Sequence, residues 1–190
     1  MPASDLVTGT DGRARCRWGA STPDYECYHD EEWGRPVRDA DALYEKLCLE
    51  SFQSGLSWLT ILRKREHFRK AFAGFEIGAV ARFGATDVER LMGDAGIVRN
   101  RAKIEATIAN ARAAAAMDDL SGLIWSHAPD PAARPAPRSM EEVPAVTPES
   151  TALAKALKLQ GFRFVGPTTA YALMQACGLV NDHLEGCHAR

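Results

Sequence analysis

Apolar side chains recur at helical spacing along most of this chain, whereas alternation of β-branched residues is never sustained for more than a few positions. Between Asp39 and Phe72 the apolar residues fall three to five positions apart, which is typical of helix faces packed on a core. One interruption, at residues 54–57, contains Gly55, a residue that favours a turn over a helix. The spacing therefore predicts two helices joined by a short loop, and the missing strand signals predict an all-α chain.

Capping patterns and composition predict further helices toward the C-terminus. Residues 100–117 are rich in alanine and carry isoleucines on one face, and Thr147 before Pro148 is typical of a helix start. Residues 128–148 hold six of the ten prolines and are predicted to form a connector. The other predicted helices are a short one opened by the capping-box pair Thr86 and Glu89, one ending at Gly161, and one over residues 168–177.

Length and charge restrict the class of protein. The 190 residues, 46% of them hydrophobic and 25% charged, are enough for one folded domain, predicted over residues 13–190 after a loose tail at residues 1–12. No window of about 18 uncharged apolar residues is present, and the N-terminus lacks a secretion signal, so a cytoplasmic protein without a membrane span is expected. The net charge of −2 argues against nucleic-acid binding through bulk charge. It leaves room for a local basic face from residues 63–70, 99–103 and 155–163.

Cysteine and histidine are concentrated at the two ends of the chain. Two thiolates and two imidazoles form a tetrahedral ligand set suited to Zn²⁺, and four protein ligands would make a closed, structural site. Cys27 and His188 are alternative ligands. In the simpler interpretation no metal is bound, Cys16 is a surface thiol, and His29 is held by a hydrogen bond. Cys48 and Cys177 lie on apolar helix faces and are assigned to the core. The candidate metal ligands are Cys16, His29, His183 and Cys187.

Aromatic residues gather around one acidic residue in the first third of the chain. Flat rings beside a carboxylate suit a planar, electron-poor or cationic ligand, through stacking, cation–π attraction and a charged hydrogen bond. A scatter of packed core aromatics is the alternative interpretation. The residues concerned are Trp18, Tyr25, Tyr28, Trp33 and Trp58, with Glu50 among them.

A tight turn precedes the last predicted helix. Residues 162–170 read FRFVGPTTA, so the turn passes through Val165 and Gly166 before the helix begins at Thr168. The free N–H groups of a helix N-terminus can hold a phosphate oxygen without reading a base. An ordinary corner between two helices is the alternative interpretation.

Taken together, these residues resemble the 3-methyladenine DNA glycosylase I family. The resemblance covers residues 13–187 in the family's order, whereas the first dozen residues have no counterpart. Arg17 and Ser54 depart from the small residue and the alanine that are usual at those places. The matching strings are CRW from Cys16, YHDEEWG from Tyr28, LESFQSGLSWLTIL from Leu49, KREHFRKAF from Lys64, DAGIVRNRAKIEATIANA from Asp94 and GFRFVGPTTAYALMQACGLVNDH from Gly161.

The resemblance implies a helix-hairpin-helix fold that flips 3-methyladenine out of double-stranded DNA and hydrolyses its N-glycosidic bond. It implies one structural zinc ion that joins the N- and C-terminal segments through the four candidate ligands above. The implied base pocket consists of Glu50, Tyr28 and Trp58, with Trp18 and Tyr25 as further wall residues. The implied DNA contacts are Gly55, Leu56, Val165, Gly166 and Thr168.

Methylation at N3 makes the adenine cationic, so its glycosidic bond is already weak and the departing base needs no protonation. Glu50 is the expected catalytic residue, because it can accept from the exocyclic amine or a ring N–H. Asp182 lies where relatives of this fold place a catalytic aspartate, but beside His183 a structural role is preferred. Residues 167–169 contain no lysine, so an enzyme without lyase activity is expected. Nothing in the sequence suggests an obligate partner, so a monomer is expected.

Two other classes of function compete with this interpretation. A zinc-dependent hydrolase of small substrates would need an open coordination position, which four protein ligands would fill. A DNA-binding module without catalysis would have no use for Glu50 and the aromatic cluster.

Overall fold

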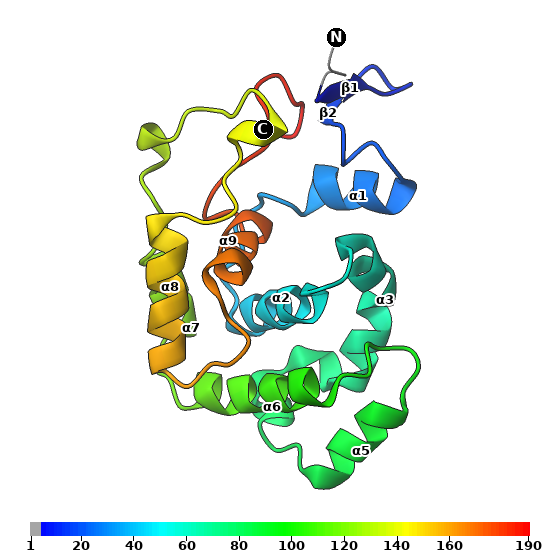
Figure 1. Cartoon of the computed structure of the whole chain (residues 1–190), viewed down its shortest axis with the longest axis vertical. Coiled ribbons are helices and arrows are strands. Elements are labelled where there is room, and N and C mark those ends of the chain that lie inside the picture. Colours follow the sequence, from blue (N-terminus) through cyan, green and yellow to red (C-terminus); the bar gives the residue numbers. More distant parts are fainter. Residues whose placement is uncertain (1–4) are drawn as a thin grey trace.

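Helices make up most of the computed structural model, which describes residues 5–190 (Figure 1). A small antiparallel sheet of two strands precedes them. The strands are β1 (Leu6–Thr8) and β2 (Ala14–Cys16), and the longer helices are α1 (Pro23–Glu31), α2 (Ala40–Gln53), α3 (Trp58–Ala71), α5 (Ala85–Gly93), α6 (Arg101–Ala115), α8 (Pro148–Leu159) and α9 (Pro167–Ala176). The shorter turns are η1 (Ala73–Phe75), α4 (Ile77–Val80), α7 (Leu120–Trp125), η2 (Pro131–Ala133) and η3 (Met140–Glu142).

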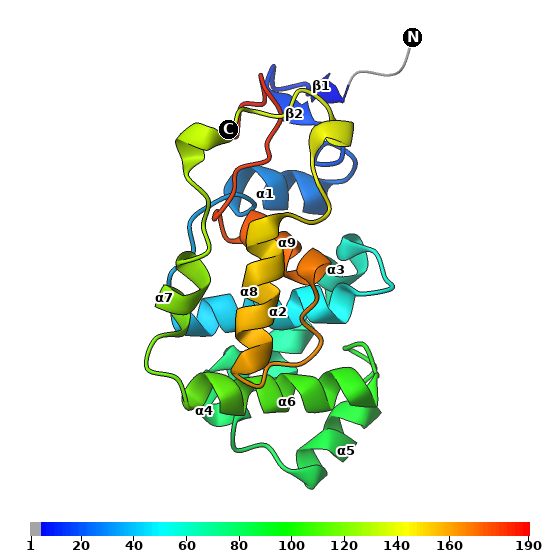
Figure 2. The same cartoon turned by 60° about the vertical axis from the view of Figure 1, so that its left-hand side comes forward.

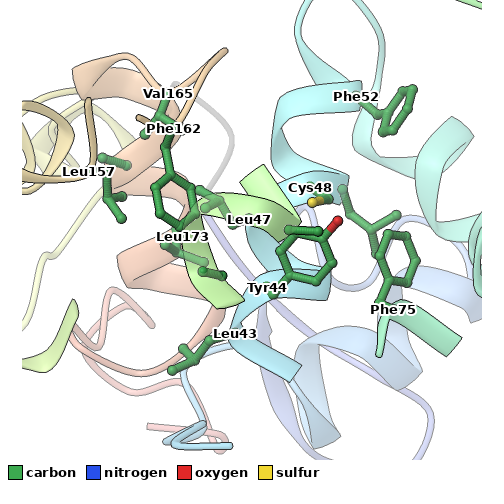
Figure 3. Packing of buried hydrophobic residues seen from close by; sticks show 14 of the residues in the cluster. Leu43, Tyr44, Leu47, Cys48, Phe52, Phe75, Leu157, Phe162, Val165 and Leu173 are labelled. Atoms are coloured by element: carbon green, nitrogen blue, oxygen red, sulfur yellow. The ribbon is translucent and has the colours of Figure 1, made fainter. Parts of the chain in front are cut away.

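Helix α2 lies at the centre and is buried on nearly every side between residues 43 and 52. It packs against α3, α6 and α9. Tyr44 and Phe75 meet edge to face, with ring centroids 6.0 Å apart, and Leu47 lies between that pair and Phe162 (Figure 3). Because α2 is enclosed by other helices, its polar residues are carried into the interior of the protein.

The connection between α8 and α9 is fixed to the core by side chains. Asn110 on α6 binds Arg163 twice, since its Nδ2 donates to the Arg163 carbonyl at 3.1 Å and its Oδ1 accepts from the Arg163 amide at 2.7 Å. Ser51 on α2 donates to the carbonyl of Phe164 at 3.1 Å. Phe164 has a left-handed backbone, with φ of 54°, which favours glycine. The turn is therefore held in one conformation by α2 and α6.

The two ends of the described chain lie side by side in both views (Figures 1 and 2). The amide of His188 donates to the Ala14 carbonyl at 2.8 Å, and the amide of Leu184 donates to Cys16 Sγ at 3.4 Å. The C-terminal segment thus covers β2 and closes the fold at this end.

The helices predicted from the sequence are present, and two predictions need correction. Residues 6–8 form a strand where a loose tail through residue 12 was predicted, so the chain is mostly helical with a small sheet and not all-α. Residues 1–4 of that tail lie outside the described residues. Helix α5 begins at Ala85, and its first turn is closed by Asp87, whose Oδ2 accepts from the Gly84 amide at 3.0 Å, so Thr86 is not its cap. Within residues 5–190 no helix is long and apolar enough to cross a membrane.

Candidate functional site

A cavity of about 300 Å³ opens between α1, α2, α3 and α9. This volume is at the lower end of the range for small-molecule sites, so the cavity suits a ligand of roughly the size of a single ring system. Six residues form its aromatic and acidic wall, and four others complete it. The wall consists of Trp18, Tyr25, Tyr28, Trp33, Glu50 and Trp58, and the other four residues are Gln53, Met140, Ala172 and Gln175.

The capped N-termini of α1 and α3 position three of the aromatic residues. Thr22 caps α1, so that Tyr25 and Tyr28 project from neighbouring turns of that helix. Trp58 is the first residue of α3, directly after the cap Ser57. The hydroxyl of Tyr25 accepts from the amide of Leu59 at 3.1 Å, which ties α1 to the start of α3.

The rings support one another at inclined or edge-on angles. Tyr28 and Trp58 have centroids 5.4 Å apart at an interplanar angle of 46°. Trp18 meets Tyr25 at 5.6 Å and 83°, and it meets Trp33 at 4.9 Å and 80°. Such edge-to-face pairs are favourable and fix the ring planes, so the wall is formed before any ligand arrives.

Glu50 is the acidic group of this cavity and is only 6% exposed. Burial raises its pKa to about 8, against the opposing attraction of Lys46. The Lys46 ammonium is itself engaged by Glu32 at 3.0 Å. Burial, and after it the charge of Glu50, also raise the pKa of Tyr28 well above its ordinary value. A cation bound in the cavity would favour the ionised form of Glu50, because its charge would offset the hydration that the carboxylate loses on burial.

The indole N–H of Trp58 is buried and finds no hydrogen-bond acceptor among residues 5–190. Buried polar groups in folded proteins are almost always paired, so an unpaired donor in a cavity wall indicates a ligand or a water molecule as its partner. The cavity therefore offers one buried carboxylate and several aromatic faces, and one of its wall residues carries a buried N–H without a partner.

The five residues predicted to bind the base all line the cavity: Trp18, Tyr25, Tyr28, Glu50 and Trp58. Sequence reasoning did not select Gln53, Ala172, Gln175 or Met140 for the site. Gln53 follows Glu50 by three positions on α2, so helical spacing carried a signal for it. Met140 comes from the proline-rich connector, whose path no local pattern encodes.

The residues predicted to contact DNA lie on two segments of the surface. Gly55, with φ of 84°, and Leu56, 43% exposed, form the loop between α2 and α3. Gly166 and Thr168 lie at the start of α9, whose first turn has no side-chain cap. The side chain of Val165 is buried in the core, so only its backbone could reach a ligand.

Four buried side chains from both ends of the chain meet behind the cavity wall, and their ligand atoms all lie within 4.8 Å of one another: Cys16, His29, His183 and Cys187. A tetrahedral site with Zn–N near 2.0 Å and Zn–S near 2.3 Å separates two nitrogens by about 3.3 Å and nitrogen from sulfur by about 3.5 Å. Here His29 Nε2 lies 3.2 Å from His183 Nδ1, and Cys187 Sγ lies 3.4 Å and 3.6 Å from these two atoms. These three distances match one face of a tetrahedral site, and Cys16 Sγ lies within 4.8 Å of all three atoms.

The outer hydrogen bonds of the two imidazoles support the same conclusion. His29 Nδ1 lies 2.8 Å from the Asp30 carboxylate, and His183 Nε2 lies 3.0 Å from the carbonyl of Trp33. Both partners accept only, so each neutral imidazole carries its proton on the outer nitrogen. The two inner nitrogens then direct lone pairs at each other across 3.2 Å, an arrangement that a bound cation would stabilise.

The alternative ligands lie outside this cluster. The Cys27 thiol is exposed, and His188 Nε2 lies 2.9 Å from the Asp30 carboxylate. Cys48 and Cys177 are fully buried, as predicted for core residues. Gly19 leaves the space that the His29 ring occupies, since a Cβ there would lie 2.5 Å from it.

Asp182 is buried outside the cavity wall and has three donors of its own. It accepts from the hydroxyl of Tyr171, from Gln175 Nε2 at 2.9 Å and from Arg134 Nη2 at 3.0 Å. Hydrogen bonds therefore occupy both of its oxygens, which fits the structural role preferred from the sequence.

Comparison with known proteins places the chain among related sequences. The methyladenine glycosylase family model matches residues 18–190. DNA-3-methyladenine glycosylase 1 of Escherichia coli (strain K12) is 48% identical over 177 residues, which are 91% of this chain and 95% of that protein. DNA-3-methyladenine glycosylase of Haemophilus influenzae is 46% identical over 178 residues, which are 91% of this chain and 96% of that protein.

Solved structures give the same result for the fold. The 3-methyladenine DNA glycosylase I structure from Staphylococcus aureus superimposes with a TM-score of 0.84 at 37% identity, covering 92% of this chain and 95% of that one. A further crystal structure of 3-methyladenine DNA glycosylase I gives a TM-score of 0.86 at 47% identity, covering 92% of this chain and 98% of the other. The chain belongs to the methyladenine glycosylase family.

Proposed function

We propose that this protein removes 3-methyladenine from double-stranded DNA by hydrolysing its N-glycosidic bond. The observation that carries the proposal is the buried carboxylate of Glu50 inside an aromatic cavity that is large enough for one base. The curated relatives carry the name of this activity, and one related structure, 37% identical, was solved in complex with 3-methyladenine.

The positive charge of the methylated base accounts for this combination of groups. A cationic base leaves without being protonated, so the protein mainly has to bind the extruded base and exclude others. The faces of Tyr28 and Trp58 attract a cation more strongly than a neutral ring. The Glu50 carboxylate adds a charge-assisted hydrogen bond to the amine or ring N–H. Ordinary bases are neutral, so they would offset less of the free-energy cost of removing the Glu50 carboxylate from water.

The DNA itself would lie across the loop after α2 and the turn before α9. Leu56 is the exposed apolar residue that would fill the gap left by the flipped base, beside Gly55. The α8–α9 pair would act as a helix-hairpin-helix, in which the uncapped amides around Gly166 and Thr168, with the backbone of Val165, hold a phosphate.

The basic side chains near that turn fit this orientation better than those of α3. On α3, Arg63 pairs with Asp24 at 2.8 Å and Arg65 pairs with Glu32 at 2.6 Å, so much of the predicted charge at residues 63–70 is compensated within the protein. The two lysines of α8, Lys155 and Lys158, form no ion pair within residues 5–190. We propose that these lysines supply the local positive charge.

The four-residue metal cluster would hold one structural Zn²⁺ ion, whose chemistry is to cross-link the two ends of the chain. Trp18 follows the ligand Cys16 by two residues, and Tyr28 precedes the ligand His29. The cluster would thus hold two wall residues of the base cavity in place. Every proposed contact with the base comes from one chain, so the protein would act as a monomer on DNA in the bacterial cytoplasm.

The first prediction is that the purified protein releases free 3-methyladenine from methylated DNA. Trp58→Phe keeps a ring but removes the unpaired N–H, and we expect release to fall about 10-fold, the usual effect of losing one buried hydrogen bond. Trp125→Phe is the matched control, because the Trp125 N–H is bonded to Val37 outside the cavity. Chromatography of the free bases measures both, and DNA binding without any base release would refute the proposed function.

The second prediction concerns the DNA product. The start of α9 reads Pro167-Thr168-Thr169 and offers no lysine to attack the sugar carbon, so we expect abasic sites without strand breaks. Gel electrophoresis of the treated DNA, with and without alkali, distinguishes the two products. Strand breaks before alkali treatment would contradict the assignment of a simple hydrolase.

A further inference from the structure

Gln175 lies on α9 between the cavity and the buried carboxylate of Asp182. Its side chain lines the cavity, and its Nε2 donates to Asp182 Oδ2 at 2.9 Å. Asp182 is 3% exposed and follows the end of α9. A glutamine in this position connects the cavity to a polar network that does not itself touch the ligand space.

That network determines which way the amide of Gln175 points. Arg134 Nη2 donates to Asp182 Oδ1 at 3.0 Å and to the hydroxyl of Tyr171 at 2.8 Å, while that hydroxyl donates to Asp182 Oδ2. Both oxygens of Asp182 therefore already accept hydrogen bonds from Arg134 and Tyr171. If the amide were turned over, its oxygen would face a carboxylate oxygen without a proton between them. The amide nitrogen therefore faces Asp182, and the oxygen, Oε1, faces away from it.

The Oε1 atom is available to a ligand. Among residues 5–190 no donor is bonded to it, and it is not one of the buried atoms that lack a partner, a class that holds only Trp58 Nε1. Since Gln175 lines the cavity, an accessible oxygen pointing away from Asp182 lies on the cavity side. The cavity thus contains a further acceptor besides Glu50.

We propose that Gln175, oriented by Asp182, is a specificity-determining residue that selects the exocyclic amine of adenine over the exocyclic oxygen of guanine. The inference rests on the proposed function and adds a choice between two N3-methylated purines. The 6-amino group of 3-methyladenine can donate one N–H to Glu50 and the other to Gln175. The 6-oxo group of 3-methylguanine would instead meet an acceptor, and a site that leaves a buried polar pair unmatched discriminates strongly.

Asp182 is a positioning residue in this scheme. Without a fixed acceptor behind it, the amide of Gln175 could rotate and present its nitrogen, which would donate to the guanine oxygen. The carboxylate of Asp182 prevents this rotation from a buried place that the base does not reach.

The test counts both bases released from the same DNA after methylation with dimethyl sulfate. Gln175→Leu should lower 3-methyladenine release by 10-fold or more and lower 3-methylguanine release less, so that their ratio falls. Asp182→Asn, which can donate to Oε1 and stabilise the turned amide, should shift the ratio in the same direction by at least threefold. Tyr171→Phe is the matched control, since it disturbs the same network but leaves the bond between Gln175 and Asp182. It should lower the melting temperature and keep the ratio.

Each outcome has a distinct meaning. Equal loss of both bases in Gln175→Leu, with a melting temperature close to that of the unaltered protein, would overturn the proposal, as would an unchanged ratio. A shifted ratio in Gln175→Leu with an unchanged ratio in folded Asp182→Asn would overturn the role of Asp182. If Asp182→Asn does not fold, Gln175→Leu alone decides whether Gln175 selects the base. If the unaltered protein releases neither base, the proposed function fails, and that result is separate from a change of ratio.

Discussion

Replacing Glu50 with glutamine is expected to lower base release about 10- to 100-fold, because the cation in the cavity loses its charged hydrogen-bond partner. Glutamine keeps the shape of the side chain and its ability to accept one hydrogen bond, so the loss reports the charge itself. The decrease in kcat/KM for 3-methyladenine release measures the effect. Retention of more than half of the activity would show that the charge of Glu50 is not needed to recognise the base.

The same substitution should make the folded protein more stable at alkaline pH. Burial raises the pKa of Glu50 from 4.5 to about 8, so the folded state binds this proton more tightly than the unfolded chain does. Ionisation of Glu50 therefore costs stability as the pH rises from 4.5 through 8, by up to about 5 kcal/mol at an upper bound of 1.4 kcal/mol per pKa unit. Glutamine carries no such cost. The difference in unfolding free energy between variant and unaltered protein should be near zero at pH 4 and largest above pH 8.

A matched acidic residue separates this effect from a general change of charge. Glu66 is an exposed partner of Arg69, and Glu66→Gln alters the net charge by the same amount as Glu50→Gln. Denaturant titrations of both variants between pH 4 and 9 should show the pH-dependent gain for Glu50→Gln alone. If the unfolding free energies of the two variants depended on pH in the same way, the pKa of Glu50 would not be raised by burial.

Local signals in the sequence were sufficient for most helices. Residues such as Thr147 and Asn100 accept hydrogen bonds from the first turns of their own helices, so the information lies within a few positions. The sheet at residues 6–16 was missed although its two strands are close in the sequence, because the groups that cover it are distant: Arg15 binds Asp30, and the C-terminal segment covers β2. Strands this short carry too few residues for an alternating pattern to be recognised.

The candidate site was predicted in part for a related reason. The aromatic residues and Glu50 were found because their residue types are unusual for a core, and because their order resembles that of a known family. Gln175 was missed because its importance depends on Asp182 behind it, and that contact exists only after α9 has folded. Val165 stays a predicted DNA contact through its backbone, because its side chain fills the core below the turn, and no neighbouring residue in the sequence indicates this burial.

Loss of the metal cluster should produce the largest decrease in stability of any single change. Cys187→Ser removes one sulfur ligand, so the two imidazole lone pairs, 3.2 Å apart, would remain without a tightly held cation. The N-terminal hairpin and residues 181–190 would then be held by their remaining contacts, among them the bond from His188 to Ala14 and the ion pair of Arg15 with Asp30. Because a structural zinc ion contributes several kcal/mol or more to folding, we expect the melting temperature to fall by about 10 °C or more.

Cys27→Ser is the matched control, since that thiol is exposed and lies outside the cluster. Elemental analysis should find one zinc ion per chain in the unaltered protein and in Cys27→Ser, and much less in Cys187→Ser. Chelation of the unaltered protein should reproduce the lower melting temperature of Cys187→Ser, and added Zn²⁺ should restore it. The fluorescence of Trp18, two residues after Cys16, should change in parallel, because the metal cluster adjoins the cavity wall. Stoichiometric zinc with unchanged melting in Cys187→Ser would show that Cys187 is not a ligand and would overturn the four-residue site.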